Sequence, residues 1–425
     1  MISRFDGFEP HQISSLRNMP ILFQHASDCA FLWYLRERAV RAPHYRMRNL
    51  LSLDRRIEAN REGLLFSGAD GQRLCEQVLQ TGEPMNVFAA ALIAYSGGSA
   101  HAIREATRAA LESARTEAAL IAALAWLPFE KIDNTLKHMI HAPNSRLHRI
   151  AIRIHGAHRR APGDTMLSFL QRADPHVAAA AARTAGELRL RDGPTVSALS
   201  ALLDDGRPDA RFWAAWSLTL LGRREGIPLL EETAASSSPR ALDALQLLLL
   251  TVPCVYGRAF VSKLAKLDHC AARAVLGCGL VGDPASIDWL IGRMRSPLAR
   301  VAGEAFSMIT GADLAYLDLD GEVPEADPAP ADTAIDAQWT DNLPDPDPQK
   351  VGSWWRANAD RFMPGQRYLC GEAPTRSSLI RILKHGYQRQ RRVAALLLAL
   401  SHPDDALFET RMRSDLQHRR QVQWS

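Results

Sequence analysis

Small and aliphatic residues gather at regular intervals along the chain, and more polar stretches separate these clusters. The clusters lie at residues 87–90, 118–121, 150–152, 177–182 and 210–216, and around Ala244, Ala274 and Ala302. Counted from Ile121, the steps to Ala151, Ala181, Ala214, Ala244 and Ala274 are 30, 30, 33, 30 and 30 residues. A constant period of about 20–50 residues is typical of solenoid proteins. We therefore expect one long repeat array rather than a set of separate globular domains.

Each repeat is predicted to contain two helices. In the clearest copy, Asp174 and Pro175 precede a helix over 177–188, Gly193 and Pro194 break the chain, and a second helix covers 195–203. Aspartate accepts hydrogen bonds from the free N–H groups of a first helical turn, and proline is tolerated in that turn. These signals therefore mark where a helix pair begins and where it turns.

Later copies repeat the same order, with helices predicted over 210–221, 227–233 and 287–294. Gly222, Gly282 and Gly311 stand where a residue in the left-handed conformation ends a helix. The alanines have a packing role, because small side chains let neighbouring helices approach closely and stack in register.

The two ends of the chain depart from the repeat. Helices are predicted over 21–40, 50–66 and 72–79 before the array, and over 353–361, 379–384 and 389–400 after it. We therefore predict an all-α fold with four segments. They are an N-terminal helical cap (1–82), the repeat array (83–311), an acidic Pro-rich linker (312–350) and a C-terminal helical module (351–425).

The helix-turn-helix order, with Asp-Pro at helix starts and Gly-Asp-Pro at 282–284, resembles bacterial HEAT-like repeats, including those of phycobilisome lyases. The segment 309–314 (ITGADL), followed by Trp354 and Trp355, is similar to the end of such arrays. This resemblance implies a right-handed α-solenoid of HEAT-like helix pairs, an architecture that mostly supplies surfaces for binding partners.

Motifs at both ends are similar to one uncharacterised proteobacterial family. They include 24–33 (QHASDCAFLW), 342–348 (NLPDPDP), 361–368 (RFMPGQRY) and 386–391 (GYQRQR). Genes of that family tend to lie near type VI secretion components. The resemblance implies an accessory or adaptor role in effector loading or assembly, with a type VI secretion effector or spike component as partner. No catalytic residues are established for the family, so none is carried over to this chain.

The formal net charge of +4 hides an uneven distribution. Residues 312–349 contain eleven acidic residues and no Lys or Arg, and the rest of the chain has 51 basic against 36 acidic residues, a formal charge of +15. Two interpretations follow. Either the acidic segment is a solvated, extended or disordered linker, or it lies on a basic face and competes there with an acidic partner.

No constellation of residues stands out as catalytic. The densest histidine region holds His138, His141, His148, His155 and His158, where i, i+3 spacing can place two imidazoles on one helix face. A closed metal site needs three or four converging ligands, so ordinary surface or capping histidines are the favoured interpretation. His269 and Cys270 are adjacent, and their side chains diverge on a helix. We expect a non-enzymatic protein with no catalytic, cofactor-binding or metal-binding residues.

Five residues are the candidates for contact with a partner: Tyr387, Arg389, Arg391, Arg392 and Trp213. The arginines form a basic cluster beside the tyrosine, and a tryptophan in a repeat helix can reach the exposed side of the array. The leading hypothesis is a protein-binding scaffold or adaptor. The alternative is a nucleic-acid-binding protein related to alkylpurine DNA glycosylases, which requires arginines along one strip of the array. A lyase acting on a bound cofactor ranks below both.

The sequence favours a cytoplasmic location and no membrane partner. No apolar run approaches the about 18 residues that a membrane span needs, and the first residues lack the apolar stretch of a signal peptide. Six dispersed cysteines without a CxxC pair are expected to be buried, reduced thiols.

Overall fold

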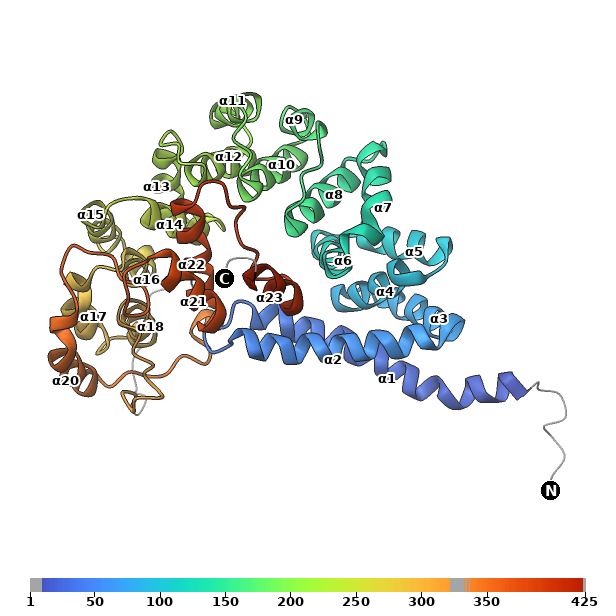
Figure 1. Ribbon diagram of the computed structural model, residues 1–425, viewed down its shortest axis with the longest axis horizontal. Helices are drawn as coiled ribbons and strands as arrows, with labels where there is room; N and C mark the ends of the chain where they lie inside the picture. The colour runs from blue at the N-terminus through green and yellow to red at the C-terminus, as the bar shows by residue number, and fades with distance from the viewer. Residues whose placement is uncertain (1–9, 322–331, 333–334, 336, 423–425) are drawn as a thin grey trace, which may run out of the picture. The chain divides into compact units, whose positions relative to one another are not determined.

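The computed structural model describes residues 10–321, 332, 335 and 337–422. Within these residues the chain forms helices and short 3-10 turns, and the only β-type pairings are isolated bridges (Figure 1). The all-α prediction is therefore confirmed. The chain divides into two compact units: unit 1 comprises Met1–Val40, Arg48–Arg160 and Arg411–His418, and unit 2 comprises Arg41–Met47, Ala161–Thr410 and Arg419–Ser425.

Unit 1 begins with two long antiparallel helices, followed by shorter ones. Its helices are α1 (Pro10–Ala39), α2 (Met47–Phe66), α3 (Gly68–Val78), α4 (Pro84–Gly97), α5 (Ala100–Ala110), α6 (Ala114–Trp126), α7 (Phe129–His141) and α8 (Ser145–His158). The successive helices α4, α6 and α8 contact one another and form a row that α5 and α7 flank. The predicted N-terminal helices are thus present, and α1 begins well before residue 21.

Aromatic rings join the first helices of unit 1 to this row. Trp33 of α1 stacks on Phe88 of α4 with ring centroids 4.8 Å apart, and Phe88 meets the edge of Trp126 from α6 at 5.9 Å. A second apolar cluster includes Leu22, Leu64 and residues of α3 and α4. Burial of these large side chains is the main term that stabilises the unit.

Unit 2 continues the pattern with two rows of helices (Figure 1). We call the first helices of its pairs the A row: α10 (Pro175–Leu188), α12 (Pro208–Leu220), α14 (Ala241–Thr251), α16 (Ala271–Val281) and α18 (Ala299–Thr310). The B row consists of α9 (Thr165–Leu170), α11 (Gly193–Ala201), α13 (Ile227–Ala235), α15 (Cys254–Leu264) and α17 (Ile287–Arg293). Short 3-10 turns lie at Leu202–Asp204, Asp268–Cys270 and Pro284–Ser286.

The periodic alanines lie where the repeat pattern predicts them. Each cluster in unit 2 falls in an A-row helix, and Ala181, Ala214, Ala244, Ala274 and Ala302 are all buried. Small residues allow close packing between successive A helices: a Cβ atom added at Gly186 of α10 would lie 2.8 Å from the Cα atom of Ser217 in α12. The alanine stripe is therefore packing material within the array.

The predicted helix starts and ends are also present. Asp174 accepts hydrogen bonds from the backbone N–H groups of His176 and Val177 at 2.9 and 3.1 Å, which caps α10. Gly222, Gly282 and Gly311 have φ angles of 87°, 74° and 75°, so each supplies the left-handed conformation after a helix. Arg159 and Arg189 adopt the same left-handed conformation at the ends of α8 and α10. Arginine is not a typical residue for this conformation, so the sequence did not predict these two helix ends.

The remaining helices lie within or after the acidic segment (312–350). They are α19 (Ala337–Thr340), α20 (Pro348–Asn358), α21 (Arg376–His385), α22 (Gln388–Ser401) and α23 (Ser414–Val422). In unit 2, α22 packs on α14 and α20 packs on α17. The helix α23 was not predicted, because its sequence is polar and lacks a periodic apolar stripe.

Candidate interaction surfaces

The predicted arginine cluster lies at the start of α22, and its members have different environments. Both carboxylate oxygens of Glu304, in α18, accept hydrogen bonds from Arg389 Nη1 at 2.8 Å. The guanidinium also lies 3.9 Å from the ring centroid of Trp339. The side chains of Arg389 and Glu304 are only 10% and 8% exposed. Arg389 therefore joins α22 to α18 and to the acidic segment.

Tyr387 precedes α22 and joins a different part of unit 2. Its hydroxyl donates to Asp313 at 2.7 Å, and the guanidinium of Arg46 lies 4.0 Å from its ring centroid. Burial, and next the hydrogen bond to Asp313, raise the pKa of Tyr387 above its ordinary value. The backbone N–H of Gln388 donates to the carbonyl of Tyr45 at 2.9 Å. The segment Arg41–Met47 is thus held by the C-terminal module.

The other two arginines of α22 differ in exposure. Arg391 is 0% exposed, and it donates to the carbonyl of Leu383 at 2.7 Å and to the side chain of Gln388 at 2.9 Å. Arg392 pairs with Asp243 of α14, and its side chain is 53% exposed. Only Arg392 of the three presents much of its side chain to solvent.

Trp213 lies in α12 and is 5% exposed. The guanidinium carbons of Arg183 and Arg240 lie 4.4 and 5.1 Å from its ring centroid, and Trp216 meets its edge at 5.5 Å. Both tryptophans of this helix are buried, so neither reaches a free surface of unit 2. Most polar groups of the five predicted residues form contacts within unit 2. Their role in binding a partner stays a prediction.

Two aspartates of the acidic segment lie on basic side chains of the A row. Asp332 pairs with Arg273 of α16 at 3.0 Å, with side chains 1% and 0% exposed. Asp345 forms two hydrogen bonds of 2.8 Å with Arg300 of α18. The sequence left open whether this segment is solvated or lies on a basic face. At Asp332 and Asp345 it lies on basic residues. The docked carboxylates neutralise part of the basic excess of the array.

The C-terminal module also covers the A row of unit 2. Beyond α22, the backbone N–H of Leu407 donates to the carbonyl of Glu187 in α10 at 2.9 Å. Arg189, at the end of α10, donates to the carbonyl of Pro403 at 3.2 Å, and burial lowers the pKa of this arginine to about 10. Leu407 and Phe408 are buried there. The C-terminal module therefore contacts the A row at the end of α10 as well as at α14.

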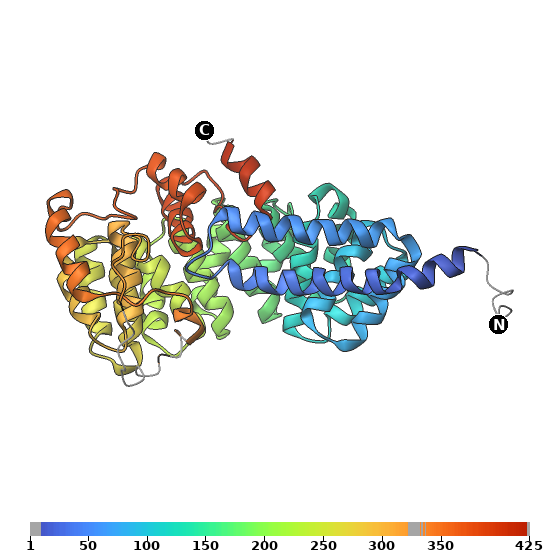
Figure 2. The same ribbon diagram turned by 90° about the horizontal axis from the view of Figure 1, so that it is seen from below.

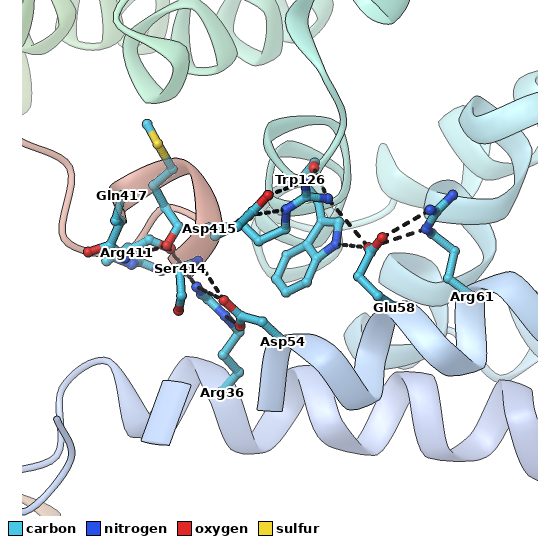
Figure 3. Close-up of polar contacts among 11 residues, drawn as sticks. Arg36, Asp54, Glu58, Arg61, Trp126, Arg411, Ser414, Asp415 and Gln417 are labelled. Atoms are coloured by element: carbon cyan, nitrogen blue, oxygen red, sulfur yellow. Dashed lines mark hydrogen bonds and ion pairs between the residues drawn. The ribbon is translucent and has the colours of Figure 1, made fainter. Parts of the chain in front are cut away.

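A buried polar network in unit 1 holds a segment from the far end of the sequence (Figure 3). Arg36 of α1 is 2% exposed and pairs with Asp54 of α2 at 2.5 Å. Its two terminal nitrogens donate to the carbonyls of Arg411 and Met412, each at 2.9 Å. Asp54 in turn accepts the backbone N–H of Ser414 at 2.6 Å.

The same network extends to α6. Glu58 of α2 accepts a hydrogen bond from the indole of Trp126 at 2.5 Å and pairs with Arg61 at 2.9 Å. Arg413 lies between Glu58, at 3.5 Å, and Asp415, at 2.6 Å. The C-terminal residues of this network lie more than 280 residues from their partners in α1, α2 and α6, as for Arg413 and the carbonyl of Trp126, so no local signal could have identified this site.

The histidine region contains single buried imidazoles. His148 and His155 contact the carbonyls of Ala142 and Arg160 at 2.7 and 3.0 Å, and Phe129 lies against both His155 and His158. Burial lowers the pKa of His155 below its ordinary value. Among the residues that the structure describes, no three His, Cys, Asp or Glu side chains converge as metal ligands.

The six cysteines are unpaired and five of them are buried. Burial raises the pKa of Cys75 and of Cys278 to about 12, which keeps both thiols protonated at neutral pH. The expectation of buried thiols therefore holds for all but Cys370, which is half-buried.

Sequence reasoning missed an exposed aromatic row on α1. Phe23, Phe31 and Tyr34 are 56%, 53% and 43% exposed. The available signal was helical spacing, since residues 23, 27, 31 and 34 share a face of a helix.

Comparison with protein families matches part of unit 2. Residues 163–249, which cover α9 to most of α14, match the family of HEAT repeats. This match supports HEAT-like repeats in this part of the chain, and the two helical rows have an all-α solenoid architecture. No curated protein and no solved structure matches the chain. Within the described residues, no helix combines the length and apolar character needed to cross a membrane.

Proposed function

We propose that this protein is a non-enzymatic scaffold or adaptor that binds other proteins. The observation that carries this proposal is the stack of HEAT-like helix pairs in which the repeated small residues are used for packing. Each added pair extends the outer surface while contacting only its neighbours, and HEAT repeats commonly use such surfaces to bind proteins.

The environment of the polar side chains supports a non-enzymatic role. Arg273, Arg391 and Asp54 are buried and satisfied by carbonyls or by an opposite charge. These contacts hold segments of the chain together, and they leave the charged groups without access to a substrate. The buried and unpaired cysteines support a reducing compartment, so we place the protein in the cytoplasm.

At a finer level, we propose an accessory role in type VI secretion, with an effector or a spike component as the partner. The support is the similarity of the end motifs, including 361–368 and 386–391, to the proteobacterial family described above. The first of these motifs contains Arg367, which donates to the carbonyls of Leu249 and Leu280 at 2.8 and 3.0 Å and so binds the C-terminal module to the A row.

The nucleic-acid alternative gains no support from the predicted arginine cluster. Binding to phosphates requires unpaired basic side chains along a strip, whereas Arg389 is paired with Glu304 and Arg391 is buried. We therefore rank protein binding first.

The test is affinity purification of the tagged full-length chain from native cells at about 150 mM salt, near physiological ionic strength. Recovery of a type VI effector or spike component supports both levels of the proposal. Recovery of a specific partner outside that system keeps the scaffold and overturns the secretion role. If no specific protein is recovered, or nucleic acid is recovered instead, the scaffold proposal fails.

A further inference from the structure

Unit 2 has a cavity of about 400 Å³ beside two of the turns that join the A row to the B row. Its lining consists of Arg191 and Val196, from the turn after α10 and from α11, and of Leu221, Gly222 and Arg223, from the turn after α12. The two turns belong to adjacent repeats, because α10 packs on α12 in the row of green to yellow helices in Figure 2. We call this space the turn cavity. Arginines from two neighbouring repeats therefore line one cavity.

The backbone that carries the two arginines is held by hydrogen bonds. The N–H of Leu190, next to Arg191, donates to the carbonyl of Ala185 in α10 at 3.0 Å. The N–H of Arg223 itself donates to the carbonyl of Leu218 in α12 at 2.9 Å. Each turn is thus bonded back to the helix that it ends. A ligand that meets the arginines has little backbone to order, which lowers the entropic cost of binding.

The charges of the two arginines are not used within the fold. Arg191 and Arg223 are exposed, and within the described residues neither guanidinium forms a hydrogen bond or an ion pair. The acids nearest to them in sequence bond to α11 instead. Asp192 accepts a hydrogen bond from a backbone N–H of α11 at 2.9 Å, and Glu225 accepts one from a serine hydroxyl of α11 at 2.8 Å. Both guanidinium groups therefore remain open to an anionic ligand.

A third arginine adds positive charge beside the turn cavity. Arg189 is 7% exposed and donates to the carbonyl of Pro403 at 3.2 Å. Burial, and next the charge of Arg191, lower the pKa of Arg189 to about 10, while Asp404 acts in the opposite direction with a smaller effect. Arg191 therefore lies near a second positive charge that is only partly compensated, and such a setting favours a bound anion.

The same array shows which anionic group its arginines bind elsewhere. Arg273 pairs with Asp332 at 3.0 Å, and Arg300 forms two hydrogen bonds of 2.8 Å with Asp345. Both aspartates belong to the acidic segment (312–350). Paired hydrogen bonds between a guanidinium and a carboxylate are among the stronger polar contacts in proteins. Carboxylates on a peptide are thus a ligand that arginines of this array already accept.

The size and lining of the turn cavity favour a peptide over a small inorganic ion. A volume of about 400 Å³ lies in the range of about 300–1,000 Å³ that is usual for ligand sites. Val196 and Leu221 add apolar surface, which a phosphate ion does not use. Neighbouring helices pack about 10 Å apart and an extended chain advances about 3.3 Å per residue, so carboxylates three residues apart match arginines on adjacent repeats.

We propose that the turn cavity binds an extended acidic segment of a protein partner. Two carboxylates of that segment, three residues apart, pair with Arg191 and Arg223, and an apolar side chain between them contacts Val196 and Leu221. The inference rests on the proposed scaffold function and specifies the surface and the class of partner.

The experiment uses the full-length chain and a short fluorescent peptide with two aspartates three positions apart and valines between them. The cavity variant is Arg191→Glu with Arg223→Glu. The matched control is Lys266→Glu with Arg295→Glu, which changes the net charge equally at two exposed positions of unit 2 outside the cavity lining. Binding is measured by fluorescence anisotropy, and circular dichroism checks that each variant folds.

We expect the cavity variant to weaken binding at least tenfold and the control to change it less than twofold. Asparagine in place of the two aspartates should weaken binding to the same extent, and a lysine peptide should bind the cavity variant better than it binds wild type. The proposal is overturned if wild type does not bind the aspartate peptide at millimolar concentration, or if the cavity and control variants bind it equally. Displacement of the peptide by an equal concentration of inorganic phosphate, or stronger binding of duplex DNA than of the peptide, also overturns it.

The affinity purification separates this inference from the scaffold proposal. A specific partner that the cavity variant retains leaves the scaffold standing and overturns the turn cavity as its binding site. A partner that is lost from the cavity variant and kept by the control supports the inference. If wild type recovers no specific protein, the scaffold proposal fails first, and the inference about the partner fails with it.

Discussion

Asp332 and Arg273 form an ion pair in which both side chains are shielded from solvent, although 58 residues separate them in the sequence. The aspartate belongs to the acidic segment and the arginine to the A row. Arg273 also donates to the carbonyls of Ala234 and Ser236 at 2.7 and 2.6 Å. The pair therefore fixes one point of the acidic segment on the repeat array.

Replacing Asp332 by alanine should destabilise unit 2 by about 3 kcal/mol, because the substitution leaves a buried guanidinium without its counter-charge. The measurement is the midpoint of chemical unfolding. Asp318→Asn is the matched control, since the Asp318 side chain is 90% exposed where it meets Lys350 and asparagine, like aspartate, tolerates the left-handed backbone (φ 53°) at this position. That control should change stability by less than about 1 kcal/mol. Similar losses in the two variants would contradict the buried pair.

Loss of the Asp54 carboxylate should release the C-terminal segment of unit 1, Arg411–His418. Asp54→Asn removes the charge that pairs with Arg36 and weakens the acceptor for the Ser414 amide. We expect faster hydrogen–deuterium exchange at the Ser414 amide, because an exposed amide exchanges more readily. Glu105→Gln, which alters an exposed pair with Arg108, provides the comparison. Unchanged exchange at Ser414 in the Asp54→Asn variant would argue against this role.

Close packing in the A row predicts a strong effect from one methyl group. Gly186→Ala places a Cβ atom 2.8 Å from the Cα atom of Ser217, which also uses its hydroxyl to contact the Ala182 carbonyl at 2.7 Å. We expect a loss of about 1–3 kcal/mol from overpacking. Gly193→Ala is the control, because a Cβ atom added at Gly193 would meet no other atom within 4 Å. Thermal unfolding of the two variants distinguishes them, and equal melting temperatures would refute the close approach.

Replacement of Arg389 and of Arg392, both in α22, should have different effects on the free energy of unfolding. Arg389→Ala removes an ion pair that is nearly buried and a ring contact with Trp339, so we expect a loss of about 2–3 kcal/mol. Arg392→Ala removes a half-exposed pair and should cost less than about 1 kcal/mol. If Arg392 contacts a partner, its substitution weakens binding in the affinity purification while unfolding stays near that of wild type. A large stability loss in Arg392→Ala would contradict this assignment.

Stability should fall in mild acid because of His155. Burial holds the pKa of this imidazole below its ordinary value of 6.5. The unfolded chain then binds more protons than the folded one just below pH 6.5, so the free energy of unfolding decreases as the pH drops through that window. His155→Asn should flatten this decrease, whereas the same substitution at the exposed His138 should not. The measurement is urea unfolding between pH 7.5 and about 5.5, and parallel curves for wild type and His155→Asn would exclude the effect.

The sequence by itself determined the helical repeat. The spacing of alanines every 30 to 33 residues placed Ala181, Ala214 and Ala244 on buried helix faces, and Asp-Pro and glycine signals located the helix ends. Such features are local, because helical periodicity, capping and left-handed termination depend on residues within one or two turns.

Only the tertiary structure decided how the polar residues are used. Arg389 and Tyr387 were candidates for contact with a partner because they belong to a basic cluster, and that role stays a prediction. Only the structure shows that they meet Glu304 and Asp313, more than 70 residues away in the sequence. Phe31 was placed in a helix over 21–40, and only the structure shows that its ring is 53% exposed. The physical reason is that the pairing of a charge or the covering of a ring depends on which distant segment the fold brings alongside. A repeat period carries no information about that choice.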